Sequence, residues 1–171
     1  MTEILKHLSR FILIGLLQIF LFSRIELGWG IHLMIYPIFI FLLPITIAPF
    51  YLMLLAFGMG IMIDIATHTY GIHASAATFI AYLRPFLLKY FAPRDGYESG
   101  NETNFFVMGS RWFIFAFGTF LFLHHAWFFL IEQFKLNDLL YVVQKIILSL
   151  PLTFVLCLFF QFIFVRKPLD R

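Results

Sequence analysis

The sequence has few charged residues and only one cysteine. Charged residues make up 12% of its 171 residues and hydrophobic residues 62%, whereas about a quarter of a soluble domain is charged. No polar block between Phe11 and Val165 is long enough to fold alone. Cys157, the single cysteine, excludes a disulfide framework and a cysteine-based metal site. The composition therefore predicts one all-α domain in a membrane.

Catalytic and nucleic-acid-binding signatures are missing as well. The sequence has no nucleophile-elbow serine, no HExxH helix, no paired membrane aspartates and no phosphate-cradling glycine loop. Its formal net charge of +3 is small, and the basic residues are too scattered to form a nucleic-acid surface. We therefore expect a non-catalytic protein without a cofactor, a metal ion or a nucleic-acid partner.

Charges and turn residues divide the apolar sequence into six pieces of membrane length. A helix needs about 20 residues to cross the hydrocarbon core. The expected spans cover about residues 8–23, 29–43, 49–65, 72–90, 107–131 and 139–165. This division predicts a polytopic bundle of about six transmembrane helices.

Residues 33–63 carry no charge and leave two arrangements open. Pro37, Pro44 and Pro49 would break a continuous helix, which predicts a short, kinked second helix and a tight turn near residues 44–49. Two short spans and a re-entrant hairpin both fit this pattern. Both also give the same sidedness.

The basic residues predict that both termini are cytoplasmic. With six spans, nine basic residues fall on the side of the N-terminus and only Arg24, Lys135 and Lys145 on the other. The nine are Lys6, Arg10, Arg84, Lys89, Arg94, Arg111, Arg166, Lys167 and Arg171. Lys89 and Arg94 extend a basic rim that suits anionic lipids and equally an acidic partner loop.

Small residues recur at helical spacing in the third and fourth spans. Ala56, Gly60 and Asp64 are four residues apart and share one helix face. Ala74, Ala77, Thr78 and Ala81 form a matching face on the next span. Because small side chains let membrane helices approach closely, we expect these two spans to pack as an antiparallel pair.

Asp64 lies near the turn at Gly71 and Ile72, where the fourth span begins. Free backbone amides and the helix dipole favour a carboxylate there, so one interpretation is a structural tie. The other is that Asp64 binds a cation, a proton or a substrate. His68 and His73 flank the turn and suggest a two-histidine, one-carboxylate metal site, but no second carboxylate accompanies them. We favour the structural role and expect no metal.

Arg84 and two adjacent histidines are the remaining candidates. Arg84 is followed by Pro85, and its guanidinium can either snorkel to the headgroups or pair within the bundle; we favour snorkelling. His124 and His125 are neighbours on a helix and point about 100° apart. We do not expect them to form a joint site.

Three short motifs and one loop carry a family resemblance. They are Gly58-x-Gly60-x-x-x-Asp64, Gly71-Ile72-His73-Ala74, Ala81-Tyr82-Leu83-Arg84-Pro85 and Pro93-Arg94-Asp95-Gly96-Tyr97. Within a chain of six short spans, this pattern resembles MreD, the family of bacterial rod shape-determining membrane proteins. The match is specific over residues 57–97 and elsewhere rests on hydrophobicity and length.

The resemblance implies a non-catalytic scaffold of the cell-elongation machinery in the bacterial inner membrane. Such a protein associates with MreC and other elongation-complex proteins and helps link MreB filaments to peptidoglycan synthesis. The fold it implies is similar to the S-components of vitamin transporters. The candidate structural and partner-binding residues are Gly58, Gly60, Asp64, Gly71, His73, Ala74 and Arg84.

Two other functions stay open at this point. The S-component likeness and the polar residues near one membrane face suggest a substrate-binding subunit of a small-molecule transporter. A membrane enzyme acting on lipid-linked intermediates rests only on the basic rim. We rank both below the scaffold.

Overall fold

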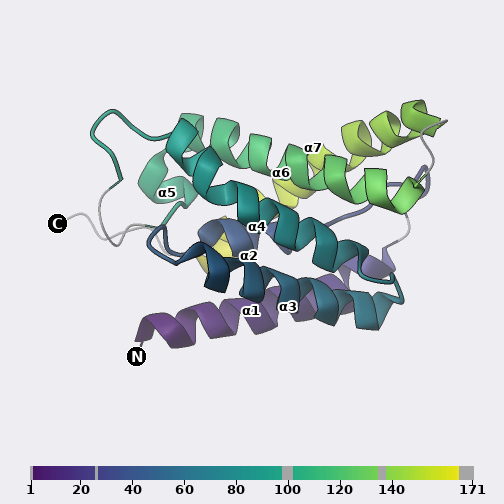
Figure 1. Ribbon diagram of the computed structural model, residues 1–171, viewed down its shortest axis with the longest axis horizontal. Helices are drawn as coiled ribbons and strands as arrows, with labels where there is room; N and C mark the ends of the chain where they lie inside the picture. The colour runs from purple at the N-terminus through teal and green to yellow at the C-terminus, as the bar shows by residue number, and fades with distance from the viewer. Residues whose placement is uncertain (1, 26, 98–101, 135–137, 166–171) are drawn as a thin grey trace.

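The computed structural model describes residues 2–25, 27–97, 102–134 and 138–165, and the secondary structure of this part is helical, with no β-strand (Figure 1). Lys135, Arg166, Lys167 and Arg171, which enter the charge count, lie outside these residues. The helices are α1 (Thr2–Phe20), the 3-10 turn η1 (Phe22–Arg24), α2 (Pro37–Leu42), α3 (Pro49–Thr67), α4 (Ile72–Tyr90), α5 (Phe105–Met108), α6 (Ser110–Gln133) and α7 (Leu139–Phe164).

Four segments of the described chain are long and apolar enough to cross a membrane. They are Glu3–Arg24, Pro49–Thr67, Ser110–Gln133 and Leu139–Phe164. Large apolar side chains on these segments are exposed, among them Leu16, Phe57, Phe115 and Phe159. In water, exposed apolar surface of this extent favours aggregation, whereas lipid tails solvate it. Length, composition and surface together indicate a membrane protein.

The helix boundaries follow several of the expected spans. α4 covers residues 72–90, α7 covers 139–164 and α3 extends to Thr67. The expected span 107–131 is divided, because Asn104 caps the short α5 and Gly109, with a φ of 80°, separates it from α6. Glycine adopts such a backbone conformation at low cost.

The prediction that the whole second span is a helix is wrong. The sequence predicts a helix over residues 29–43, but only Pro37–Leu42 is helical, and residues 31–35 have no regular secondary structure. A buried apolar run of this length does not by itself distinguish helix from other backbone conformations. The turn expected near residues 44–49 is confirmed, since residues 43–48 form a turn and α3 begins at Pro49.

The long helices run along one direction of the molecule and give it two ends (Figure 1). The Asp64 end contains η1, the turn between α3 and α4, and the start of α7. The Glu102 end contains the start of α1, the turn at residues 43–48, and the segment between α4 and α5. We use these two names below.

Residues 31–43 pass through the middle of the bundle between these ends. The N–H of His32 bonds to Ser149 in the first half of α7, and the carbonyl of Phe41 bonds to Thr103 at the Glu102 end. Residues 33–43 are all buried, and α2 contacts α1, α3, α4 and α6. Residues 31–43 thus run from the Asp64 end to the Glu102 end, and α3 returns from there to the Asp64 end.

Candidate functional site

α3 and α4 form the antiparallel pair that the small residues predict. Their backbones meet where Gly60 faces Ala74: a Cβ on Gly60 would lie 2.3 Å from the Cα of Ala74 and 2.7 Å from the carbonyl carbon of His73. Side chains do not tolerate such distances, so only glycine fits. A Cβ on Gly58 would meet no heavy atom within 4 Å. Gly60 is therefore a packing residue of the pair, and Gly58 is not.

The carboxylate of Asp64 joins the end of α3 to the start of α4. Its Oδ1 accepts from the N–H of His73 at 3.0 Å and its Oδ2 from the N–H of Ala74 at 2.9 Å. Amides in the first turn of a helix have no partner in the helix, and the dipole favours an anion there. Oδ1 also accepts from the Thr69 hydroxyl at 2.6 Å and lies 3.0 Å from His73 Nδ1. The structural tie expected at Asp64 is present.

The turn between α3 and α4 uses left-handed backbone conformations. His68, Tyr70 and Gly71 have φ values of 58°, 47° and 89°; glycine is the residue that adopts this region most readily. His68 is exposed and His73 is buried. Within the described residues, Asp64, His68 and His73 do not form a group with metal-ligand spacing. The turn is held by hydrogen bonds and backbone geometry.

Arg84 does not snorkel, contrary to the interpretation that the sequence favours. Its side chain is 2% exposed, and its guanidinium donates to the carbonyls of Phe41 at 3.0 Å, Pro44 at 3.4 Å and Leu43. The last carbonyls of α2 have no partner within the helix, and the negative end of a helix dipole attracts a cation. The prediction failed because nothing in the sequence indicates that a short helix ends beside α4.

Side chains of α1 and α7 bind the non-helical backbone that precedes α2. Gln18 donates to the carbonyl of residue 33 at 3.0 Å and accepts from the N–H of residue 35 at 2.8 Å. Ser149 accepts from the N–H of residue 32 at 3.0 Å, and Thr153 from that of residue 34 at 3.3 Å. Non-helical backbone at membrane depth is tolerated only where such partners satisfy it. Gln18, Ser149 and Thr153 interrupt apolar runs of the sequence. This interruption is the signal by which sequence reasoning could have found them.

Two buried histidines of α6 have roles that the sequence did not indicate. Nε2 of His124 lies 2.5 Å from the hydroxyl of Tyr36, next to α2. Nδ1 of His125 bonds to the carbonyl of Leu121 at 2.9 Å, and its Nε2 lies 3.4 Å from the Thr153 hydroxyl. The two side chains have different partners, as their angular separation predicts. Both connect α6 to the middle of the bundle.

A cavity of about 450 Å³ opens at the Asp64 end. Its walls come from η1 and the end of α1, from residues 25 and 27–33, from the turn between α3 and α4, and from the last turns of α6. Beside it, the Glu132 carboxylate lies 2.7 Å from Lys145 Nζ and 3.6 Å from His32 Nε2. Thr69 and His73, which belong to the Asp64 junction, line this cavity.

At the Glu102 end, an ion-pair cluster joins α1 to the segment before α5. The Glu102 carboxylate lies 2.5 Å from Lys6 Nζ and 2.9 Å from Arg10 Nη1. Burial alone would raise the pKa of Glu102, but the hydrogen bonds from Lys6 and Arg10 outweigh it and hold this pKa below its usual value. The cluster fixes the start of α1 beside the connection between α4 and α5.

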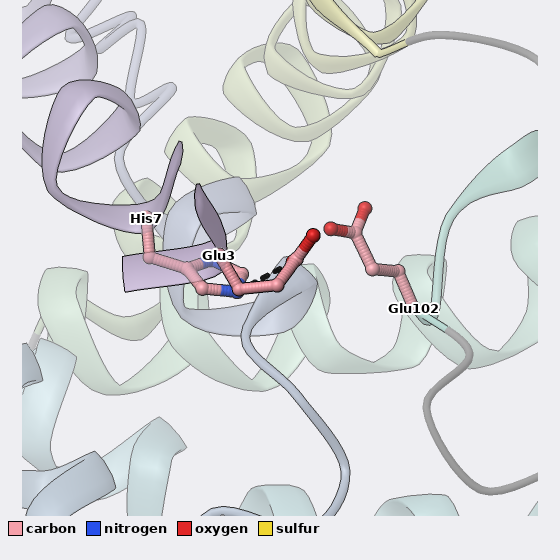
Figure 2. A group of neighbouring side chains, drawn as sticks. All are labelled: Glu3, His7 and Glu102. Carbon is pink, nitrogen blue, oxygen red and sulfur yellow. Dashed lines mark ion pairs between the residues drawn. The ribbon is translucent and has the colours of Figure 1, made fainter. Parts of the chain in front are cut away.

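Figure 2 shows the one group of the described residues with metal-ligand spacing, Glu3, His7 and Glu102. Glu3 and His7 lie one turn apart on α1, with His7 Nε2 at 3.9 Å from the Glu3 carboxylate, and Glu102 approaches from the facing segment. Lys6 contacts both carboxylates, at 3.3 Å from Glu3 and 2.5 Å from Glu102. Because Lys6 neutralises both carboxylates and Arg10 also pairs with Glu102, the group is an ion-pair network.

The structure therefore gathers most of the sequence candidates at one place. Five of them meet at the junction between α3 and α4, namely Gly60, Asp64, Gly71, His73 and Ala74. Arg84 lies apart, at the end of α2, and Gly58 takes part in neither place. No protein-family model, curated protein or solved structure gave a significant match to the chain.

Proposed function

We propose that this protein is a non-catalytic membrane scaffold of the bacterial cell-elongation machinery, as its resemblance to MreD implies. Its partner is MreC, and through MreC it helps link MreB filaments to peptidoglycan synthesis and so controls cell shape. The observation that carries the proposal is the junction between α3 and α4. Five of the motif residues on which the resemblance rests make contact there, namely Gly60, Asp64, Gly71, His73 and Ala74.

We place the chain in the inner membrane with six crossings and both termini in the cytoplasm, an arrangement similar to that of transporter S-components. α2 and the residues before it form the second crossing. Support comes from the Glu102 cluster, which holds the start of α1 and the connection after α4 at the same end. That end is the one where the basic residues gather, including the exposed Lys89 and Arg94.

Single-cysteine labelling tests this topology, because Cys157 is the only cysteine to remove. In a Cys157→Ala background, Tyr70→Cys places a thiol at a fully exposed position of the Asp64 end, and Asp95→Cys places one at the Glu102 end. A membrane-impermeant maleimide should label the first in intact spheroplasts and the second only after permeabilisation. The reverse pattern, or labelling of both, would overturn the topology.

We place the partner's transmembrane helix in a shallow groove of about 530 Å³ between α3 and α4. Ala74, Ser75 and Thr78 are small lining residues, and Phe57 and Trp127 line it as well. Small residues between bulky ones allow a second helix to approach closely in a bilayer, where packing drives association. Hydroxyls in the groove add hydrogen-bonding groups.

Co-purification of MreC with the tagged protein from mildly solubilised membranes tests the scaffold. The wild-type protein should retain MreC, and Thr78→Phe, which fills the groove, should reduce the recovery about tenfold or more, as expected when about 1.4 kcal/mol of binding is lost. Val155→Phe, on the exposed face of α7, is the matched control and should leave recovery unchanged. Depletion of the protein should also round the cells. Failure to recover MreC with the wild type, together with normal rods on depletion, would refute the scaffold.

A further inference from the structure

The cavity at the Asp64 end has the size of a small-molecule site. Its volume of about 450 Å³ lies within the range of about 300–1,000 Å³ of typical ligand pockets. Its lining is both polar and apolar, with Thr69, His73 and Glu132 on one hand and Leu33, Ile72 and Phe128 on the other. This composition suits a ligand that has one polar and one apolar part.

Most polar groups of the lining already have partners. Both ends of the Gln18 amide bind backbone, and the Thr69 hydroxyl donates to Asp64. His73 is different: its Nδ1 faces the Asp64 carboxylate at 3.0 Å. Because a carboxylate only accepts, Nδ1 donates to it, and in the neutral imidazole Nε2 is then the acceptor.

The charge of the lining is negative. Among the described residues of the lining, Glu132 is the one that is charged when the histidines are neutral. Lys145, the cation that pairs with Glu132, is 7% exposed; it bonds to Glu132 at 2.7 Å and lies 5.5 Å from the ring centre of Phe129 and 4.9 Å from that of Tyr141. Lys145 is not among the residues that line the cavity, and among the described residues the second oxygen of Glu132 has the Nε2 of His32 nearby, at 3.6 Å.

A bare metal ion does not fit this arrangement. The donor atoms of His32, His73 and Glu132 do not converge to metal-ligand spacing within the described residues. The cavity is also far larger than an ion. The spare groups are acceptors, and they complement N–H donors carried on a small organic molecule.

We propose that this cavity binds a small amphiphilic organic cation, with its ammonium group at Glu132 and His73 and its apolar part against Phe128 and Ile72. An aromatic or aliphatic primary amine has this chemistry. The ring of Phe128, which meets the His73 ring edge to face at a centre distance of 4.9 Å, offers an apolar wall. The site goes beyond the scaffold role and does not depend on it, because the partner groove lies on another face.

Thermal unfolding of the full chain in nanodiscs, followed by tryptophan fluorescence, tests the site. The probe is phenethylamine, and 3-phenylpropionate and 2-phenylethanol are controls of matched size with the opposite and with no charge. A bound ligand stabilises the folded state by mass action. Phenethylamine should raise Tm saturably, by about 5 °C at a hundredfold excess over Kd, and the two controls should raise it much less.

Variants decide whether the effect arises in the cavity. Glu132→Gln keeps the shape and should raise the Kd for phenethylamine at least tenfold, whereas Glu3→Gln, at the Glu102 end, should leave it unchanged. Ile31→Trp fills the cavity and should abolish the shift, which keeps the test decisive where Glu132→Gln fails to fold. No saturable shift with phenethylamine, an equal shift with 3-phenylpropionate, or a shift that persists in Ile31→Trp would overturn the proposal.

Discussion

In the pair of helices α3 and α4, the backbone hydrogen bonds lie mostly within each helix, and one side chain, Asp64, joins the two ends at the turn. In residues 31–43, the backbone depends on side chains from elsewhere in the chain, including Gln18, Thr153 and Arg84. Both regions are buried in the same bundle. They differ in where their hydrogen-bonding partners lie in the sequence.

Because of this difference, we expect the two regions to respond to different kinds of substitution. A regular helix pair is sensitive to side-chain volume at its closest approach, because its backbone needs no outside partner. A broken segment is sensitive to the loss of a polar group far away in sequence, since an unsatisfied buried carbonyl or amide costs about 1–3 kcal/mol. The following substitutions test this contrast in order of expected effect.

Arg84→Met should have the largest effect, because it leaves the carbonyls at the end of α2 without their donor. We expect a loss of about 3 kcal/mol in the free energy of unfolding, measured by SDS titration in mixed micelles. Arg84→Lys should lose less, since it keeps the charge but not the fork of donors. Lys89→Met, at an exposed position of the same helix, is the control. An Arg84→Met protein as stable as this control would show that α2 does not depend on Arg84.

Gly60→Ala should come next and acts on the helix pair by volume alone. The new Cβ would lie 2.3 Å from the Cα of Ala74, so the helices must separate at a cost of about 2 kcal/mol. Gly58→Ala, half a turn away on the same helix, adds the same methyl group where no heavy atom lies within 4 Å. Its stability should be unchanged or higher by up to about 1 kcal/mol. Equal effects in the same unfolding assay would contradict the close approach at Gly60.

Asp64→Asn should destabilise the pair by about 1 kcal/mol, because a neutral amide oxygen accepts more weakly from the amides of His73 and Ala74. The asparagine side chain would still accept through its one oxygen, so the effect is smaller than that of overpacking in Gly60→Ala. Hydrogen exchange at the His73 and Ala74 amides should increase at the same time. Asp95→Asn, at an exposed loop position, should change neither quantity. If Asp64→Asn left the exchange unaltered, the tie would have no energetic role.

Glu102→Gln should have the smallest effect, about 0.5 kcal/mol at neutral pH, and it should alter the pH dependence. The pKa of Glu102 is lower in the folded state than its usual value, so its contribution is complete above the usual carboxyl pKa and is lost as the pH falls through the folded value. The wild type should therefore lose stability on acidification by more than Glu102→Gln does. Parallel acid-unfolding curves for the two proteins would count against the cluster.

Much of this fold follows from local patterns. The starts of α3 and α4, the turn after Pro44 and the tie at Asp64 were expected, because hydrophobic length, prolines and a carboxylate beside a helix start act over a few residues. The failure at Arg84 was non-local. Arg84 was expected to snorkel, since its neighbours in sequence place it toward a membrane face, but its partners are 40 to 43 residues away.

The sequence by itself determined a membrane-embedded all-α bundle and the antiparallel pairing of α3 and α4, since composition and periodicity are local properties. Only the tertiary structure decided that residues 31–36 are not helical, that Arg84 binds the end of α2, and that a polar cavity opens beside His73. Each of these depends on which atoms of distant segments meet. An apolar buried run is stable in any conformation whose backbone groups find partners, and those partners are set by the packing of the whole chain.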